Sequence, residues 1–149
     1  MLSRKSLFLI LLICVTLIVV RSFAKDVNET YVLRVIDGDT VALKGGQRVR
    51  YIGIDTPEKG RPYYLEAKKE NERLVLGKKV RLEFDVEKQD KYGRTLAYVY
   101  VGNVFINAEL VKNGYAMVYT CPPNVKYAKT FLALQREARK AKRGLWGLR

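Results

Sequence analysis

The first hydrophobic pattern along the chain is an unbroken apolar run at residues 7–20, preceded by Arg4 and Lys5. A helix of about 14 residues would be about 21 Å long, shorter than the roughly 30 Å hydrocarbon core of a bilayer. A positive start, a short apolar centre and small residues before a cut after Ala24 are typical of a signal peptide. We therefore predict a signal peptide or an uncleaved N-terminal membrane anchor over residues 1–24, with a core helix as a third interpretation.

After residue 24 hydrophobic and polar residues alternate at the short spacings typical of strands and helices in a folded domain. Apolar and β-branched residues alternate with polar ones in several short segments, which predicts strands. Gly45-Gly46, between two of these segments, predicts a hairpin with a two-residue loop. The predicted strands cover residues 31–36, 40–43, 48–54, 80–86, 95–101 and 104–106.

Helical periodicity occurs in three places. A helix is predicted over residues 63–76, where apolar and small residues recur every three to four positions until Gly77. Asn107 can cap a short helix that runs to Lys112. The last helix precedes Gly144, and we expect Trp146 to pack back against the strands. The shared apolar face of the first helix carries Tyr64, Ala67, Asn71, Leu74 and Val75, and that of the last carries Phe131, Leu134, Ala138 and Ala141.

This order of elements predicts an α+β fold. Five or so strands, with one helix after the third and two helices at the end, fit a small closed antiparallel barrel, because closure removes exposed strand edges. One domain over residues 25–149, with its core at about residues 31–146, accounts for the whole pattern.

Composition narrows the chemistry. The 149 residues include 28 Lys+Arg, 15 Asp+Glu and no His, which gives a formal net charge of +13. Without histidine there is no Ser-His-Asp or Cys-His nucleophile pair and no His-ligated zinc. Two cysteines, Cys14 and Cys121, are too few for a disulfide framework or a thiolate metal cluster. Catalysis at neutral pH would depend on carboxylates and cationic side chains, together with a metal ion.

The candidate chemistry lies at the ends of the predicted hairpin. A two-residue loop would place Asp39 opposite Ile52, so that Asp39 and Arg50 share a face. Asp55 joins them only if the strand ends or bulges near Gly53, since strict alternation would turn it to the other face. Two carboxylates with a backbone carbonyl form a hard oxygen site suited to Ca²⁺, although Asp and Gly are also ordinary turn residues.

Three ordered motifs make a family resemblance specific. They are Val35-Ile-Asp-Gly-Asp-Thr-Val41, Arg50-Tyr-Ile-Gly-Ile-Asp-Thr-Pro-Glu58 and Asp90-Lys-Tyr-Gly-Arg-Thr-Leu-Ala-Tyr98. They closely resemble the staphylococcal nuclease (thermonuclease) family, over residues 31–146. The resemblance implies a five-stranded OB-fold barrel with three helices, and a calcium-dependent endonuclease that cleaves DNA and RNA and leaves 3′-phosphates.

The resemblance also assigns roles residue by residue. Asp39 and Asp55 match the family's calcium carboxylates, and Thr56 matches its backbone-carbonyl ligand. Arg50 and Arg94 match the two catalytic arginines, which suit phosphodiester chemistry because guanidinium forks bind phosphate oxygens bidentately. The remaining matches are Glu58 for the carboxylate usually assigned as general base, Asp37 for an acid beside the metal site, and Lys91, Tyr92 and Tyr119 for substrate contacts.

The implied partners are DNA and RNA, preferably single-stranded. The protein would be a monomer that is secreted or held outside the cytoplasm by its N-terminal segment. One alternative is a noncatalytic OB-type nucleic-acid binder, which should lack one or more of the acid and arginine residues of the motifs. A second is a cationic membrane-surface protein that binds through its basic terminal helix. Nothing in that protein would need the acid–arginine cluster.

Overall fold

The computed structural model describes residues 29–148, so the predicted leader at residues 1–24 lies outside the described part of the chain. Within it, no helix is long and apolar enough to cross a membrane. The strands are β1 (Glu29–Asp37), β2 (Thr40–Leu43), β3 (Arg48–Tyr51), β4 (Ile54–Asp55), β5 (Lys79–Glu83), β6 (Thr95–Val101), β7 (Val104–Phe105) and β8 (Met117–Val118). The helices are α2 (Tyr64–Val75), α3 (Ile106–Lys112), α4 (Ala128–Lys140) and a 3₁₀ turn, η1 (Gly144–Gly147).

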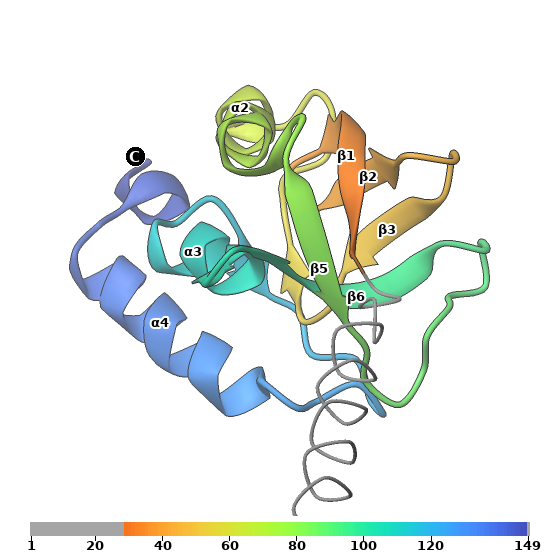
Figure 1. Cartoon of the computed structure of the whole chain (residues 1–149). Helices are drawn as coiled ribbons and strands as arrows, with labels where there is room; N and C mark the ends of the chain where they lie inside the picture. The colour runs from red at the N-terminus through yellow and green to blue at the C-terminus, as the bar shows by residue number, and fades with distance from the viewer. Residues whose placement is uncertain (1–28, 149) are drawn as a thin grey trace, which may run out of the picture.

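Five strands close into a barrel. Pairing runs β3-β2-β1-β5-β6, and β6 then pairs with β3 to complete the ring (Figure 1). All of these pairs are antiparallel except β3–β6, which is parallel. We predicted an antiparallel barrel, but a ring with an odd number of strands cannot alternate direction all the way round. One parallel seam is therefore required, and here it aligns Arg50 with Leu96.

The longest strand, β1, serves two partners. Its first residues, Glu29 to Tyr31, pair with β5, and the rest pair with β2. The register with β2 shifts between Val32 and Arg34 and again between Val35 and Asp37. Irregularities of this kind bend a strand and increase its twist, which allows one strand to form part of two sides of a small barrel.

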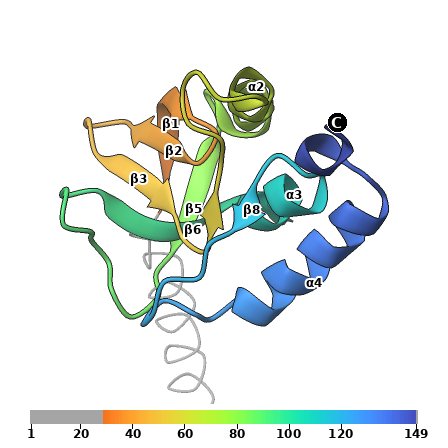
Figure 2. The ribbon, with the colours of Figure 1, turned by 180° about the vertical axis from the view of Figure 1, so that it is seen from behind.

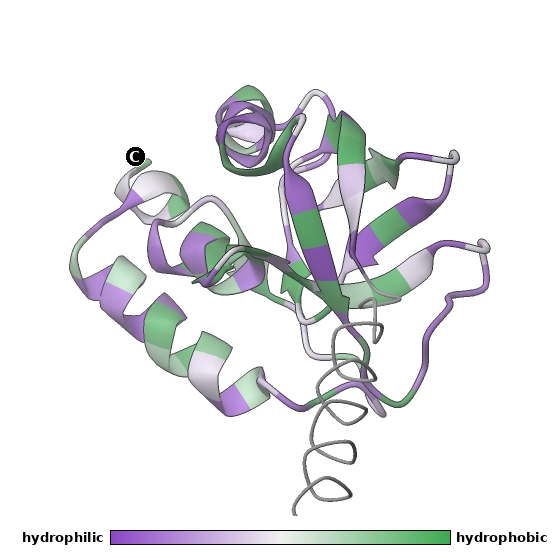
Figure 3. Ribbon diagram, viewed as in Figure 1, coloured by the Kyte–Doolittle hydropathy of each residue, from purple (hydrophilic) through white to green (hydrophobic). Residues whose placement is uncertain are grey.

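The predicted α+β barrel with three α-helices is confirmed, and the helices cover it from outside (Figures 1 and 2). Along β5 hydrophobic and charged residues alternate, and Val80 and Leu82 are the buried ones (Figure 3). Helix α2 packs against β1, and α4 packs against α3 through Phe131 and neighbouring side chains. The largest fully buried side chains are Tyr51, Tyr98, Phe131, Leu43, Ile54, Ile106 and Leu110.

The β2–β3 hairpin differs by one residue from its predicted register. Leu43 N–H donates to the Gln47 carbonyl at 2.8 Å, so the loop holds three residues instead of two. Its first residue, Lys44, donates its N–H to Tyr31 on β1, and the two glycines that follow both have positive φ. Asp39 therefore lies opposite Tyr51, and alternation alone would place Asp39 and Arg50 on opposite faces.

Two predictions near the C-terminus are wrong. Asn107 does not cap α3; it lies inside the helix, fully buried, where its side chain accepts from Val99 N–H and donates to the Ile52 carbonyl. Trp146 packs beside α4, with the Arg139 guanidinium 4.2 Å from the centre of its ring, and does not fold back onto the barrel strands.

Candidate active site

The turn before β2 is packed directly against the segment after β4. Asp37 Oδ1 accepts the N–H of Asp39 at 3.2 Å, which closes the turn around Gly38. A Cβ at Gly38 would lie 2.7 Å from Thr56 Oγ1, closer than side-chain atoms approach. Glycine is therefore required here by close approach, and this approach brings Asp39 and Thr56 together although they are far apart in sequence.

Asp39 is buried and accepts several hydrogen bonds. Its Oδ2 accepts from Thr56 N–H at 2.8 Å and from Thr56 Oγ1 at 2.9 Å, while Oδ1 accepts from Thr40 Oγ1 at 3.1 Å. Burial raises the pKa of this carboxyl above its ordinary value, and the nearby Asp37 charge adds to the rise, whereas the Arg50 guanidinium and the Thr56 bonds lower it. A neighbouring positive charge is thus needed to keep the buried group ionised.

Arg50 supplies that charge and links both predicted metal carboxylates. Its Nη1 lies 3.1 Å from Asp39 Oδ2 and its Nη2 lies 2.8 Å from Asp55 Oδ1. Nη1 also donates to the carbonyls of Tyr51 at 3.1 Å and Ile54 at 2.9 Å. Asp39 therefore meets Arg50 as expected, but not through the predicted register: Asp39 lies opposite Tyr51, in the turn before β2.

Asp55 reaches this cluster because β3 ends at Tyr51. Gly53 adopts a φ of 80°, and a Cβ there would lie 2.7 Å from Phe131 Cε2, so only glycine fits the bend that leads into β4. The interruption near Gly53 on which the meeting of Asp55 with Arg50 depended is thus present, and the single strand predicted over residues 48–54 is divided into β3 and β4. β4 then pairs with β8, and Tyr119 N–H, just beyond β8, donates to the Gly53 carbonyl at 2.9 Å.

Arg94 is held by the turn that precedes β6. Asp90 accepts from the Arg94 backbone N–H at 3.0 Å and from its Nε at 2.7 Å, and it also accepts from Tyr92 N–H. Within residues 29–148, neither terminal nitrogen of Arg94 has a hydrogen-bonding partner. The guanidinium is therefore anchored through one edge while its outer fork remains free to bind an anion. The Tyr92 ring lies 5.5 Å from the guanidinium carbon and 5.1 Å from Lys91 Nζ.

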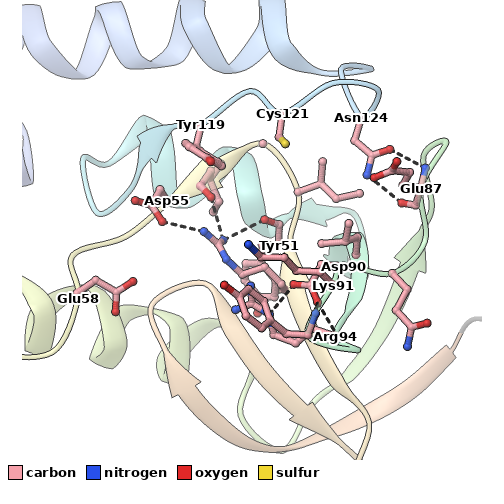
Figure 4. A pocket seen from close by; sticks show the side chains of 17 residues that line it. Tyr51, Asp55, Glu58, Glu87, Asp90, Lys91, Arg94, Tyr119, Cys121 and Asn124 are labelled. Atoms are coloured by element: carbon pink, nitrogen blue, oxygen red, sulfur yellow. Dashed lines mark hydrogen bonds and ion pairs between the residues drawn. The ribbon is translucent and has the colours of Figure 1, made fainter.

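These groups line one pocket of about 940 Å³. Figure 4 shows Asp55 and Glu58 at one end of it, Glu87 and Asn124 at the other, and Tyr119 across from Arg94 and Lys91. Of the predicted site residues, those on its wall are Arg50, Asp55, Glu58, Lys91, Tyr92, Arg94 and Tyr119. Asp39 and Thr56 are not on the wall; Asp39 is only 4% exposed and meets the pocket residues through Arg50.

The side-chain oxygens of the site provide only part of the ligand shell that a hard cation needs. Asp39 and Asp55 both face one guanidinium, so their charges already converge on one positive position, and carboxylate oxygens suit Ca²⁺. Among the residues that the structure describes, no three or more Asp, Glu, His or Cys side chains gather closely enough to hold a metal ion. A cation here would need further oxygen ligands besides these two carboxylates.

A sequence model of the family described as "Staphylococcal nuclease homologue" matches residues 48–147. The chain belongs to the staphylococcal nuclease family. It is 43% identical over 129 residues to a thermonuclease of Staphylococcus hyicus, covering 80% of this chain and 76% of that protein. It is 42% identical over 124 residues to the endonuclease YncB of Bacillus subtilis, covering 76% of this chain and 59% of that protein.

The sequence did not reveal two residues, Asn71 and Asn124, that support the site of this nuclease-family chain. Asn71 appeared only as a member of the apolar face of α2, yet it bonds to the turn that carries Asp39. Asn124 bonds through both amide atoms to the backbone of Glu87, each at 2.8 Å, and thereby ties together the two loops that face each other across the pocket. The sequence offered one indication that Asn71 has a special role: it is a polar residue on the predicted apolar face of the helix.

Proposed function

We propose that this chain is an exported, calcium-dependent endonuclease that hydrolyses phosphodiester bonds of DNA and RNA and leaves 3′-phosphates. Membership of the family and its thermonuclease and endonuclease relatives support a nuclease. The observation that carries the finer proposal is the arrangement of the pocket. Two carboxylates converge beside Arg50, and the free fork of Arg94 and the free carboxylate of Glu58 share the same cavity.

Asp39, Asp55 and the Thr56 carbonyl would hold Ca²⁺, and the bound ion would polarise the phosphodiester and neutralise developing negative charge. The chain's own part is to keep two carboxylates close together against their mutual repulsion. Arg50 does this by pairing with both, and Thr56 does it by donating twice to Asp39.

Arg94 and Arg50 would bind the phosphate oxygens, more tightly when the phosphorus becomes five-coordinate and the charge on its oxygens grows. Arg94 is suited to this because Asp90 fixes its position and leaves both terminal nitrogens available. The guanidinium stays charged at any physiological pH, so the donors need no proton adjustment during the reaction.

Glu58 would orient a water molecule and accept its proton. Its carboxylate is exposed at one end of the pocket and, within residues 29–148, has no hydrogen-bond or ion-pair partner. The water oxygen would bond to phosphorus as the P–O5′ bond breaks, so that the phosphate stays on the 3′ side and the departing oxygen takes a proton as the 5′-hydroxyl.

Lys91, Tyr92 and Tyr119 would contact the strand on either side of the scissile phosphate. Tyr92 is 71% exposed and Tyr119 is 58% exposed, so each ring presents a face on which a base can stack, and an unpaired base stacks most readily. The net charge of +13 would attract any polyanion, with affinity that falls as salt rises. These features support a preference for single-stranded DNA or RNA. We propose that the chain binds this substrate as a monomer.

The N-terminal apolar segment supports the proposed export. Expression of the full chain followed by mass spectrometry of the mature protein tests this part: a start at Lys25 would indicate cleavage, and a membrane-bound full-length chain would indicate an anchor. An intact chain recovered in the cytoplasm would refute export in either form.

The deciding experiment for the activity is digestion of a single-stranded DNA oligonucleotide in Ca²⁺ and in EGTA. We expect cleavage with Ca²⁺, products that carry a 3′-phosphate, and no cleavage with EGTA. Binding without calcium-stimulated cleavage would instead support the noncatalytic OB-type binder. All five acid and arginine residues that such a binder would be free to lose are present: Asp39, Asp55, Glu58, Arg50 and Arg94.

A further inference from the structure

A fully buried amide side chain joins α2 to the carboxylate turn. Asn71 is 0% exposed; its Nδ2 donates to the Asp37 carbonyl at 3.0 Å, and its Oδ1 accepts from the Tyr51 hydroxyl at 2.9 Å. The carbonyl can only accept, so the chemistry of the partners fixes which end of the amide faces which group. The hydroxyl of Tyr51 then donates to the remaining oxygen, and both polar ends of Asn71 are satisfied.

Both partners of Asn71 hold Asp39 from opposite sides. Asp37 closes the turn by accepting the Asp39 N–H, and Tyr51 donates its own N–H to the Asp39 carbonyl at 2.9 Å. Tyr51 also follows Arg50 directly, and its carbonyl accepts from that guanidinium. One side chain on α2 therefore fixes the distance between the two backbone segments that carry Asp39 and Arg50.

Packing alone does not call for a polar residue at this position. Ala67 and Val75 on the same face of α2 are also fully buried, and they supply the apolar contact with the barrel. A buried amide must recover the cost of leaving water through well-made hydrogen bonds, and Asn71 makes both of its bonds to residues that flank the site. The amide thus adds orientation at the site to the apolar contact that its neighbours already provide.

We propose that Asn71, acting with the Tyr51 hydroxyl, is a positioning residue that sets the Asp37–Asp39 turn for metal binding. The proposal rests on the proposed function, because it gives Asp39 the role of a calcium ligand. Groups that hydrogen-bond directly to a metal ligand commonly change metal affinity or activity by about 10–100-fold when removed, and Asn71 acts one bond further out, so we expect an effect at the lower end of that range.

The test compares three variants with the wild-type chain. Asn71→Leu keeps the size of the side chain and removes both bonds, and Tyr51→Phe removes only the hydroxyl. Val75→Ala is the matched control, since it lies on the same face of the same helix, is equally buried and has no polar contact with the turn. Each protein is titrated with Ca²⁺ in a calorimeter without nucleic acid, well below its melting temperature.

We expect Asn71→Leu to weaken Ca²⁺ binding about tenfold and Tyr51→Phe about threefold, with Val75→Ala within twofold of wild type. The Ca²⁺ concentration that gives half-maximal cleavage should rise in the same order, while kcat in saturating Ca²⁺ changes less. If Asn71→Leu does not fold, Tyr51→Phe carries the test. If Asn71→Leu and Tyr51→Phe both bind Ca²⁺ with the same affinity as Val75→Ala, the proposal is overturned.

Amide hydrogen exchange without metal separates this proposal from the proposed function. The Thr56 N–H donates to Asp39 Oδ2, so its exchange reports the position of that carboxylate. We expect Asn71→Leu to accelerate exchange at Thr56 more than at Val49 in the barrel, and Val75→Ala to affect both alike. If the wild-type chain does not bind Ca²⁺, the proposed function is refuted. If the wild-type chain and Asn71→Leu bind Ca²⁺ with equal affinity, only the positioning role is refuted.

Discussion

Replacing Arg94 with alanine should separate catalysis from folding. The Arg94–Asp90 pair is half-buried, with the two side chains 30% and 16% exposed, and a pair within reach of solvent contributes about 1 kcal/mol to stability. The melting temperature should therefore fall by only a few degrees. In the proposed reaction, however, the free fork of Arg94 binds the phosphate most strongly at the transition state. Removing one such donor costs about 100-fold in kcat, or about 2.7 kcal/mol.

The assay is cleavage of a single-stranded oligonucleotide in saturating Ca²⁺, with kcat and kcat/KM measured separately. Both should fall together, because an interaction made mainly in the transition state contributes little to ground-state binding. Arg73→Ala on α2 is the matched control: it also removes one arginine from a carboxylate pair, but at a site outside the pocket. The reasoning is refuted if Arg94→Ala keeps more than about a third of kcat, or if Arg94→Lys restores wild-type kcat, since a point charge should not replace a bidentate fork.

The remaining predictions concern the supports of the site. Gly38→Ala should push Thr56 away from Asp39 and lower the free energy of unfolding by about 1–3 kcal/mol, which a lower melting temperature would show. The Ca²⁺ concentration for half-maximal cleavage should rise, and unchanged values of both would contradict the close approach. Glu58→Gln should leave the melting temperature unchanged and reduce kcat about 100-fold, and an active variant would remove its role as base. Burial alone would raise the pKa of Asp90, but hydrogen bonds from Arg94 and nearby backbone N–H groups outweigh burial and hold the pKa below its ordinary 3.8. The stabilisation from that pair should thus be complete at neutral pH and be lost as the pH falls below about 4; Asp90→Asn, compared with wild type by urea unfolding across this range, should lack that loss.

Local patterns in the sequence were enough to predict the barrel strands and the three α-helices, but not the short strand β8. The helix at residues 63–76 is α2 to within a residue at each end, because apolar spacing and Gly77 define it without help from the rest of the fold. The interruption that brings Asp55 to Arg50 was likewise predicted, since a glycine followed by Thr56-Pro57 favours the end of a strand.

Features that depend on contacts distant in sequence were not predictable. The N–H of Lys44 bonds to β1, which displaced the hairpin register by one residue, and no pattern within the hairpin reveals that contact. Asn107 resembles a helix cap in sequence, but in the folded chain its amide joins β6 to the turn after β3. The parallel seam follows from the number of strands in the ring, which became certain only when the pairing was known.

The parallel seam between β3 and β6 also links the pocket to closure of the barrel. Arg50 comes from one side of the seam, and Arg94 lies immediately before the other, so the two side chains line one pocket only when these distant strands pair. Contacts between residues so far apart in sequence form only after the entropy cost of closing the intervening loop has been overcome. A chain whose ring is still open contains every residue of the proposed site but does not bring them together, so folding and activity should be gained in the same step.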